Sequence, residues 1–369
     1  MLKTNFLGIE LKNPVIVAAG PWSRDGRSLV KSIEAGAGAV VTESVVSDSL
    51  PDMRPYVVGN DKGTQNIRLY SNLQVEDWEK EIAMAKNAGG VVIGSVSAQT
   101  PSEVAYISSK LEKYGCDAIE ISVGNPSMEA LEVMASKAEL VYDITKEVVS
   151  SVKIPVMAKL SQNTTNISKV AKAVKAAGGT GISAINAVRG ILSVDVETAR
   201  PALSTYGGIS GEYIRPLGLS SVATIAQSVD IPIVGVGGIS SATNALEYLM
   251  LGATAVEVGS AVMKEGYEVI TKIVSDLEDW AESHGVGSTG DISGRALVNM
   301  KSFDEMRFVP VVSTVQNVMC VDDCNKCLLI CGDDAISKER DVVTVDHSRC
   351  TGCGVCNFEC PAGKFQLEW

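Results

Sequence analysis

Hydrophobic and polar positions follow a repeating order along the first 283 residues. A short, nearly continuous run of β-branched and small apolar residues is followed each time by a longer stretch with helical period. Such apolar runs are typical of parallel strands that are covered on both faces. Eight runs predict strands, at residues 14–20, 39–44, 91–98, 118–124, 155–161, 181–187, 231–239 and 255–263. Eight strand–helix units in this length predict a TIM (β/α)8 barrel of the α/β class.

The stretches between the strands predict helices, for example at residues 102–114, 167–177 and 240–251, each ending near a glycine that suits a helix C-cap. Residues 45–72 and 192–213 break the alternation because they follow strands without a helical pattern. Long loops inside a compact domain are usually functional. Both should emerge at the C-terminal mouth of the barrel, where active sites of this fold lie.

Length and composition predict one large domain followed by a small one. With 369 residues, 46% of them hydrophobic, the chain can bury a large core. We expect the barrel at residues 1–307, including a connector from about residue 285, and a second domain at residues 308–369. The net charge of -12 argues against nucleic acid or an anionic membrane surface as a partner, since both require a positive surface.

The most specific motif is the run Cys350-Thr-Gly-Cys353-Gly-Val-Cys356-Asn-Phe-Glu-Cys360-Pro, which resembles the C-x2-C-x2-C-x3-C-P pattern of bacterial ferredoxins. A second group of four cysteines lies upstream, and its first interval has three residues where two are usual, so Cys320 is its least secure ligand. In two-cluster ferredoxins the fourth cysteine of the run ligates the other cluster. The predicted ligand sets for two 4Fe-4S clusters are therefore Cys320, Cys324, Cys327 and Cys360, and Cys331, Cys350, Cys353 and Cys356. The second domain is accordingly expected to be a small α+β, ferredoxin-like domain.

Disulfides and structural zinc are the alternatives, since cysteine pairs at short spacing also occur in zinc sites. Two complete quartets, one of them ending in Cys-Pro, favour the clusters. The ninth cysteine, Cys116, lies alone before a predicted strand, and we interpret it as a packing residue. The chain also begins without a signal-peptide pattern and has no apolar run that could span a bilayer, so we expect a protein of the reducing cytoplasm.

Glycines follow the seventh and eighth predicted strands, in Gly235-Val-Gly237-Gly238 and in Glu257-Val-Gly259-Ser260. This is where TIM barrels commonly bind phosphate through bare backbone amides, although composition alone leaves ordinary turns open. The spacing does not match G-x-G-x-x-G, which argues against a nicotinamide-binding domain in this chain.

Several motifs taken together resemble the dihydroorotate dehydrogenase family, in the arrangement of a barrel followed by a ferredoxin domain that dihydropyrimidine dehydrogenase has. The resemblance extends from about residue 3 to the end. It is carried by Lys-Asn-Pro at 12–14, Ala-Ala-Gly at 18–20, Met-Ala-Lys-Leu at 157–160, Ala-Ile-Asn at 184–186, Gly-Gly-Ile-Ser-Gly at 207–211, Ile-Arg-Pro at 214–216, Gly-Gly-Ile at 237–239 and Gly-Ser at 259–260.

The resemblance implies an FMN that lies across the barrel mouth. Lys159 would lie near the N1/O2 edge of the flavin, where a cation stabilises the anionic reduced form, and Asn186 would bind the flavin or the substrate. A lysine at the end of an apolar parallel strand is costly unless it meets an anion or a polar ligand. The remaining implied FMN contacts are Ala19, Gly20, Ser44, Gly208, Ser210, Gly237, Gly238, Gly259 and Ser260.

The loop after the fourth strand departs from the family. The family usually has Asn-x-Ser-Cys-Pro there, and this chain has Ser122-Val-Gly-Asn125-Pro, so Asn125 replaces the acid/base and Ser122 a substrate-binding asparagine. An amide cannot act as a general acid. Glu43 and Tyr70 are the candidate proton donors, with Ser127 as a weaker third. Glu43 and Tyr70 complete the candidate catalytic set with Asn125, Lys159 and Ser122.

Four residues are candidates for substrate binding: Arg68, Asn72, Asn186 and Ala187. A guanidinium suits a carboxylate or another anion, although a solvated loop charge is an equally good interpretation of Arg68. Asn72 resembles a substrate-contacting position of the family.

The sequence predicts an oxidoreductase that passes electrons between 4Fe-4S clusters and FMN and reduces or oxidises a CH–CH group of a small unsaturated or cyclic substrate. The expected redox partner is a ferredoxin or a separate NAD(P)H-oxidising flavoprotein subunit, and a homodimer is expected by analogy. Two alternatives stay open: an electron-transfer subunit that has lost catalysis, and a dihydropyrimidine or dihydroorotate dehydrogenase with a displaced acid/base.

Overall fold

The computed structural model describes residues 2–48, 54–306, 311–321, 324–340 and 342–367. The chain divides into two compact units, Met1–Met300 and Lys301–Trp369, and each is described by itself. The predicted domain boundary between residues 307 and 308 falls outside the described residues.

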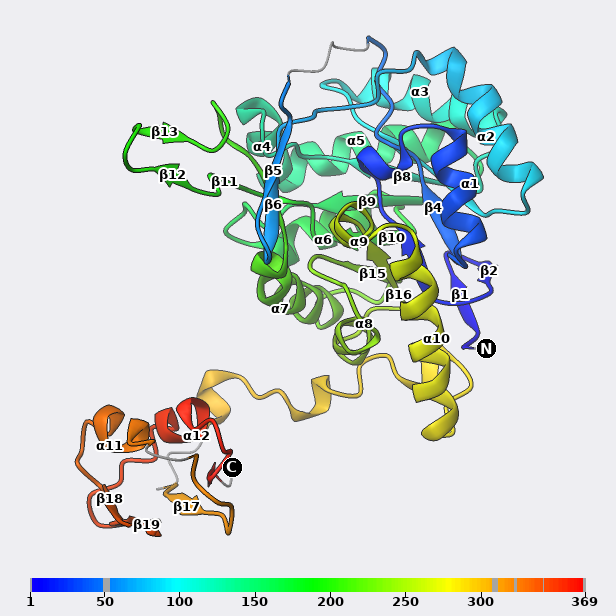
Figure 1. The fold of residues 1–369 in the computed structure, drawn as a ribbon. Helices are drawn as coiled ribbons and strands as arrows, with labels where there is room; N and C mark the ends of the chain where they lie inside the picture. The colour runs from blue at the N-terminus through cyan, green and yellow to red at the C-terminus, as the bar shows by residue number, and fades with distance from the viewer. Residues whose placement is uncertain (1, 49–53, 307–310, 322–323, 341, 368–369) are drawn as a thin grey trace. The chain divides into compact units, whose positions relative to one another are not determined.

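Eight parallel strands of the first unit close into a barrel in which neighbours follow chain order (Figure 1). Each lies within one of the eight predicted runs, so the predicted TIM barrel is confirmed. The strands are buried along their whole length or nearly so, which explains their continuous apolar sequences. They are β3 (Val15–Val17), β4 (Ala39–Val41), β7 (Val92–Val96), β8 (Ala118–Ser122), β9 (Val156–Leu160), β10 (Gly181–Ala184), β15 (Ile233–Val236) and β16 (Ala255–Val258).

Helices surround the barrel (Figure 1). They are α1 (Gly26–Glu34), α2 (Trp78–Asn87), α3 (Pro101–Lys113), α4 (Glu129–Ser136), α5 (Ala138–Ser151), α6 (Ile167–Ala176), α7 (Arg215–Ala226), α8 (Ala242–Met250), α9 (Ser260–Glu265) and α10 (Glu268–Ser283). Short 3-10 helices occur at Pro21–Ser23, Val75–Asp77, Glu212–Ile214, Thr289–Asp291, Leu297–Asn299 and Phe303–Glu305. The Asp25 side chain caps α1 by accepting a hydrogen bond from the Ser28 amide at 2.9 Å. The three helices predicted above correspond to α3, α6 and α8.

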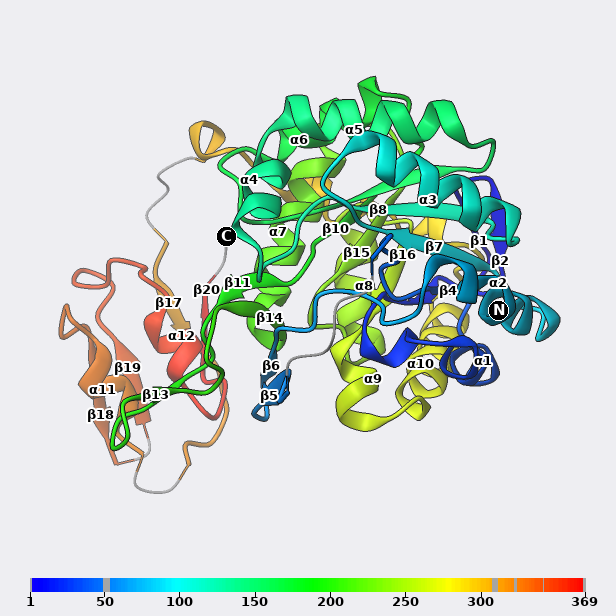
Figure 2. The same cartoon turned by 90° about the horizontal axis from the view of Figure 1, so that it is seen from above.

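The two segments that break the alternation pair with each other over the barrel mouth. The first segment contributes β5 (Val57–Gly59) and β6 (Gly63–Asn66), and the second contributes β14 (Gly207–Gly211). With β11 (Val188–Gly190), which lies just before the second segment, they form a four-stranded antiparallel sheet in the order β11-β14-β6-β5 (Figure 2). Thr64 of β6 and Ser210 of β14 are opposite each other, and their hydroxyl oxygens are 2.8 Å apart. A second hairpin, β12 (Val194–Asp195) with β13 (Arg200–Pro201), lies between β11 and β14 in the chain.

The barrel interior changes from apolar to polar along the strands. At the N-terminal end the hairpin β1 (Thr4–Phe6) and β2 (Ile9–Leu11) closes the barrel, and Phe6 and Leu11 pack against inward residues such as Met157. Side chains two positions further along a strand point the same way. In three strands that next position is charged, with Glu120 two residues after Ala118, Lys159 after Met157 and Glu257 after Ala255. The polar layer therefore lies toward the C-terminal mouth.

The second unit is small and built around cysteines. It contains β17 (Ser313–Val315) paired with β20 (Phe365–Leu367), β18 (Ile336–Glu339) paired with β19 (Val342–Val345), and the short helices α11 (Lys326–Ile330) and α12 (Val355–Glu359). Its buried cluster consists of Cys327, Val343, Cys356 and Phe365. Within the described ranges of the whole chain, no helix is both long enough and apolar enough to cross a membrane.

Candidate active site

A pocket of about 1140 Å³, partly open to solvent, lies at the C-terminal mouth of the barrel. It is formed by the ends of the barrel strands and by the four-stranded sheet above them. Most of the residues predicted from the sequence line it: Ala19, Gly20, Glu43, Ser44, Arg68, Ser122, Asn125, Lys159, Asn186, Ala187, Gly208, Ser210, Gly237, Gly238, Gly259 and Ser260. Tyr70 and Asn72 do not line it, and lie in the chain just beyond Arg68.

Glycines form one edge of the pocket, and any larger residue at these positions would force neighbouring atoms to move. Gly238 has φ +68°, and a Cβ atom there would lie 2.7 Å from the carbonyl oxygen of Gly211. A Cβ atom on Gly208 would lie 2.8 Å from the Cβ atom of Ala187. Because the backbone is bare at these positions, its amides can approach a bound anion closely.

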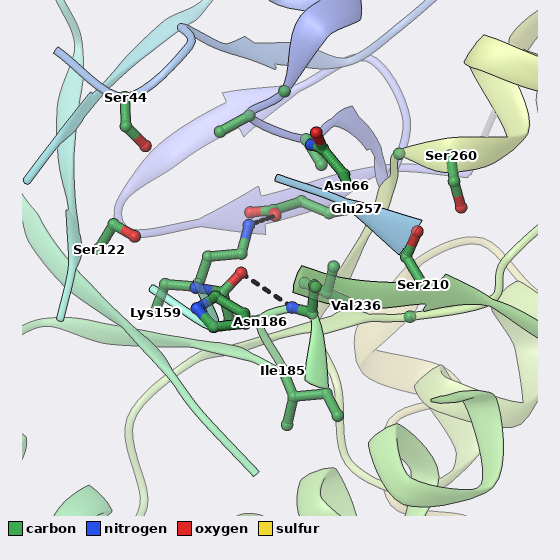
Figure 3. A pocket seen from close by; sticks show the side chains of 18 of the residues that line it. Ser44, Asn66, Ser122, Lys159, Ile185, Asn186, Ser210, Val236, Glu257 and Ser260 are labelled. Carbon is green, nitrogen blue, oxygen red and sulfur yellow. Dashed lines mark hydrogen bonds and ion pairs between the residues drawn. The ribbon is translucent and has the colours of Figure 1, made fainter. Parts of the chain in front are cut away.

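The floor of the pocket carries a buried lysine, Lys159, between Glu257 and Glu120. Figure 3 shows Lys159 pointing toward Glu257. The Lys159 Nζ atom is 2.7 Å from Oε2 of Glu257 and 3.5 Å from Oε2 of Glu120. The Glu257 Oε1 atom also accepts a hydrogen bond from the Ser183 hydroxyl at 3.3 Å. Both Glu120 oxygens are buried and have no hydrogen-bond partner in the described residues.

The three charged groups of the floor change one another's protonation. Burial disfavours the ammonium form of Lys159, but Glu120 and Glu257 outweigh that effect and raise the pKa of Lys159 to about 12. Burial, reinforced by the negative charge of Glu257, raises the pKa of Glu120 to about 8. The floor therefore favours a charged Lys159 and a protonated Glu120.

Arg68 and Glu43 form a bidentate ion pair in the wall of the pocket. The Arg68 Nε atom is 2.6 Å from Glu43 Oε1, and Nη2 is 2.9 Å from Oε2. Only 8% of the Arg68 side chain and 5% of the Glu43 side chain are exposed. Arg68, the candidate anion-binding residue, is thus paired with Glu43, a candidate proton donor. Their positions in the sequence do not predict this pairing.

In the loop after β8, backbone groups bind the Asn125 side chain. The Asn125 Nδ2 group donates to the Leu69 carbonyl oxygen at 3.3 Å, and Oδ1 accepts from the Ser127 amide at 3.0 Å. The Ser122 hydroxyl donates to the Gly124 carbonyl oxygen at 3.4 Å. Both side chains line the pocket, but these bonds fix the direction of the Asn125 amide.

Tyr70 and Asn186 both contact this loop. The Tyr70 hydroxyl donates to Met128 Sδ at 3.4 Å, and burial raises the Tyr70 pKa against the opposing effect of nearby Ser97 and Asn125. The Asn186 Nδ2 group donates to the Gly124 carbonyl oxygen at 2.9 Å.

Sequence reasoning missed several residues of the pocket. Trp22 forms a wall beside the glycines, since a Cβ atom on Gly259 would lie 2.9 Å from its ring, and its Nε1 group donates to the Ala18 carbonyl oxygen at 2.6 Å. Glu120 and Glu257 were missed as partners of Lys159, although a single charge inside an apolar parallel strand is itself a signal. Asn66 and Thr64 were missed because the pairing of the two loop segments was not predicted.

The eight cysteines of the second unit line two separate cavities. One cavity is lined by Cys320, Cys324, Cys327 and Cys360, and the other by Cys331, Cys350, Cys353 and Cys356. Each cavity has a cysteine that accepts a hydrogen bond from the amide four residues later in the chain. The Ala335 amide donates to Cys331 Sγ at 3.3 Å, and the Lys364 amide donates to Cys360 Sγ at 3.4 Å.

All nine cysteines are free thiols. Burial, and then the proximity of Cys360, raise the pKa of the Cys327 thiol. In the described ranges, no three or more His, Cys, Asp or Glu side chains converge closely enough to hold one metal ion between them. Cys116 is buried in the barrel core, as predicted for a packing residue.

The fold and the pocket place the chain in the class of (β/α)8-barrel enzymes, whose active sites lie at this end of the strands. The family model described as "Dihydroorotate dehydrogenase" matches residues 1–280. The chain therefore belongs to the dihydroorotate dehydrogenase family, as its motifs suggested. This confirms the expected oxidoreductase acting on CH–CH groups and supports the expected flavoprotein.

Similar proteins include three named "Dihydroorotate dehydrogenase B (NAD(+)), catalytic subunit". The protein of Methanocaldococcus jannaschii is 38% identical over 284 residues, which cover 75% of this chain and 92% of the relative. Those of Thermoplasma volcanium and Pyrococcus abyssi are 36% and 34% identical, each over 300 residues that cover 80% of this chain, with 98% and 99% of the relative covered.

A crystal structure of dihydroorotate dehydrogenase from Eimeria tenella in complex with ferulenol shares the fold, with a TM-score of 0.70 at 15% identity, covering 80% of this chain and 88% of that one. The family match ends at residue 280, well before the cysteine-rich unit.

Proposed function

We propose that the chain is a flavin and iron–sulfur oxidoreductase. Its barrel binds FMN, its second unit binds two 4Fe-4S clusters, and electrons pass between them while a small unsaturated or cyclic substrate is reduced or oxidised. The observation that carries the proposal is that one chain combines the pocket of a dihydroorotate dehydrogenase-family barrel with two cavities, each lined by four cysteines.

The residues of the barrel mouth fit FMN. The glycine edge formed by Gly208, Gly237, Gly238 and Gly259 leaves room for the phosphate, with Ser210 and Ser260 as hydroxyl donors. Lys159 supplies a buried positive charge for the N1/O2 edge. Ala19, Gly20, Ser44 and Asn186 would line the ring. When bound, FMN exchanges electrons one at a time with iron–sulfur clusters and two at a time with a substrate.

The residues of the second unit fit two clusters. Each cavity provides four thiols, the number that a 4Fe-4S cluster requires, and backbone amides point at Cys331 and Cys360, which is how proteins tune such clusters. The wide interval after Cys320 is accommodated, since Cys320 lines the same cavity as Cys324. Cysteines used as cluster ligands fit a reducing compartment, and this supports a cytoplasmic protein.

The proton that accompanies substrate chemistry has two candidate sources. Tyr70 adjoins Asn125 and keeps its proton at neutral pH, because burial raises its pKa. Glu43 lines the pocket but is bound to Arg68. We therefore propose that this ion pair forms part of the wall that contacts the substrate. Asn125, Ser122 and Ala187, which line the pocket, would then contact or orient the substrate, whereas Asn72 does not line the pocket and is left out of this set.

A separate redox partner is part of the proposal. Relatives named as catalytic subunits support it, since a catalytic subunit implies at least one further subunit. The partner would be a ferredoxin or an NAD(P)H-oxidising flavoprotein subunit that exchanges electrons with the clusters.

The proposal is tested by following the flavin and cluster absorbance of the anaerobically purified chain. Reduced ferredoxin should bleach bound FMN, and the bleaching should slow at least tenfold when Cys353 is replaced by serine, because one cluster is lost. Cys116→Ala is the matched control, since Cys116 lies in the barrel core. Equal bleaching rates in the wild type and the Cys353→Ser variant would contradict a route through the clusters.

Dihydroorotate oxidation with a displaced acid/base is the second candidate, favoured by the identity to the named relatives. Orotate or dihydroorotate should then change the flavin absorbance of the wild type. If no substrate in a broad panel reoxidises the reduced flavin, the chain is an electron-transfer subunit instead, an outcome that the backbone-bound Asn125 amide would explain.

A further inference from the structure

The buried glutamate on the pocket floor has no role in the function proposed so far. Glu120 is completely buried, and its two oxygens have no hydrogen-bond partner in the described residues. Its charged partner of opposite sign is Lys159, at 3.5 Å, and Glu257 lies closer to that lysine, at 2.7 Å. A buried carboxylate whose oxygens accept no hydrogen bond is disfavoured in its ionised form.

The surroundings of Glu120 contain two charged groups. They are Lys159 on β9, at 3.5 Å, and Glu257 on β16, which itself is bound to Lys159. β7, which pairs with β8, contributes the hydroxyl of Ser95, and β10, which pairs with β9, contributes the hydroxyl of Ser183.

The other barrel strands, β3, β4 and β15, present apolar inner side chains, namely Ile16, Ala39, Val41, Val234 and Val236. All eight barrel strands are among the described residues, and they place no other titratable group in this layer.

The charge balance of the floor depends on one proton. With Glu120 protonated, Lys159 and Glu257 form a neutral pair. With Glu120 ionised, the buried floor carries a net negative charge beside Lys159, the residue proposed to face the flavin edge that would gain negative charge on reduction. Two such charges in a buried site repel each other strongly, because the effective dielectric constant is low.

We propose that Glu120 is a redox-linked proton site: where it is ionised before reduction, it takes up one proton from solvent when FMN in the pocket is reduced and releases that proton when FMN is reoxidised. This inference rests on the proposed binding of FMN. In the balance, two electrons from the donor and one proton go to the flavin, which becomes anionic, and a second proton goes to the Glu120 carboxylate. Lys159 then stays available to the flavin, because only one carboxylate competes for it.

The uptake is visible only where Glu120 is ionised before reduction. Since burial raises its pKa to about 8, Glu120 is already protonated at lower pH, and reduction there consumes one proton for two electrons. Above pH about 8, reduction consumes two protons. A tenfold change in proton concentration then shifts the two-electron midpoint potential by about 59 mV instead of about 30 mV.

The test is a series of anaerobic flavin redox titrations between pH 6 and about 10 on the full chain, in the wild type, Glu120→Gln and Glu132→Gln. Glu132 is a matched control because it is also a buried glutamate with a pKa raised by burial but does not line the pocket. We expect the slope to steepen near pH 8 in the wild type and in Glu132→Gln, and to stay at about 30 mV per pH unit in Glu120→Gln.

A second measurement needs no variant. The infrared difference spectrum of the wild type, reduced minus oxidised at pH 9, should gain a band of a protonated carboxylic acid. A single slope in the wild type, or the absence of that band, would overturn the inference while leaving FMN binding intact. A preparation that binds no FMN would give no flavin potential at all, and would instead contradict the proposed function.

Discussion

Replacing Gly238 with alanine tests whether the glycine edge of the pocket binds the FMN phosphate. Gly238 has φ +68°, a conformation that costs a residue with a Cβ atom about 1–2 kcal/mol. The new Cβ atom would also lie 2.7 Å from the Gly211 carbonyl oxygen, which is too close, so one of the two backbone segments must shift. Loss of one hydrogen bond to the charged phosphate costs about 1.5–3 kcal/mol, which corresponds to about a tenfold to hundredfold weaker FMN affinity.

The assay is a titration of the FMN-free protein with FMN, followed by the flavin fluorescence. Gly285→Ala is the matched control, because Gly285 has φ +63° and a Cβ atom there would meet no atom within 4 Å. Both variants should lose stability through the positive φ, Gly238→Ala more because of its clash with Gly211, and only Gly238→Ala should lose FMN affinity. A Gly238→Ala protein that binds FMN as tightly as the wild type would refute this assignment of the phosphate site.

Three further predictions concern the clusters and the buried charges. Cys353→Ser should lower the iron content from about eight to about four atoms per chain, whereas Cys116→Ala should leave it unchanged; colorimetric iron analysis decides. Arg68→Gln should lower the free energy of unfolding by about 3–5 kcal/mol, because it removes one partner of a buried ion pair, and the double variant with Glu43→Gln should recover most of the loss in denaturant titrations. Folding raises the Glu120 pKa from 4.5 to about 8, so the free energy of unfolding should fall as pH rises between these values. When unfolding is measured from pH 5 to about 9, the stability of Glu120→Gln should depend less on pH than that of the wild type.

The barrel was predictable from the sequence because each strand carries its own signal. Buried parallel strands such as β8 and β9 must be apolar along nearly their whole length, and the chain alternates them with amphipathic helices. The sheet over the mouth was not predictable, because β6 and β14 are far apart in the chain and meet only through backbone pairing. Local pattern says nothing about which distant segments pair.

The site was predictable where backbone geometry requires a particular residue. The glycine at position 238 and the spacing of the cysteines can each be recognised from a short stretch of sequence. In the structure Gly238 lines the pocket, and the cysteines line two cavities. The charged pairs were not predictable, because the partner of Lys159 lies on a strand 98 residues further along the chain. Likewise, the sequence leaves Arg68 open between an anion-binding residue and a solvated loop charge, and only the fold brings Glu43 to it.

The central claim is that a flavin in the barrel and two iron–sulfur clusters in the second unit belong to one chain. Anaerobic purification followed by determination of iron, sulfide and FMN tests it most directly. The account predicts one FMN and about eight iron atoms per chain. A colourless, iron-free protein that cannot be reconstituted with iron, sulfide and FMN would contradict it.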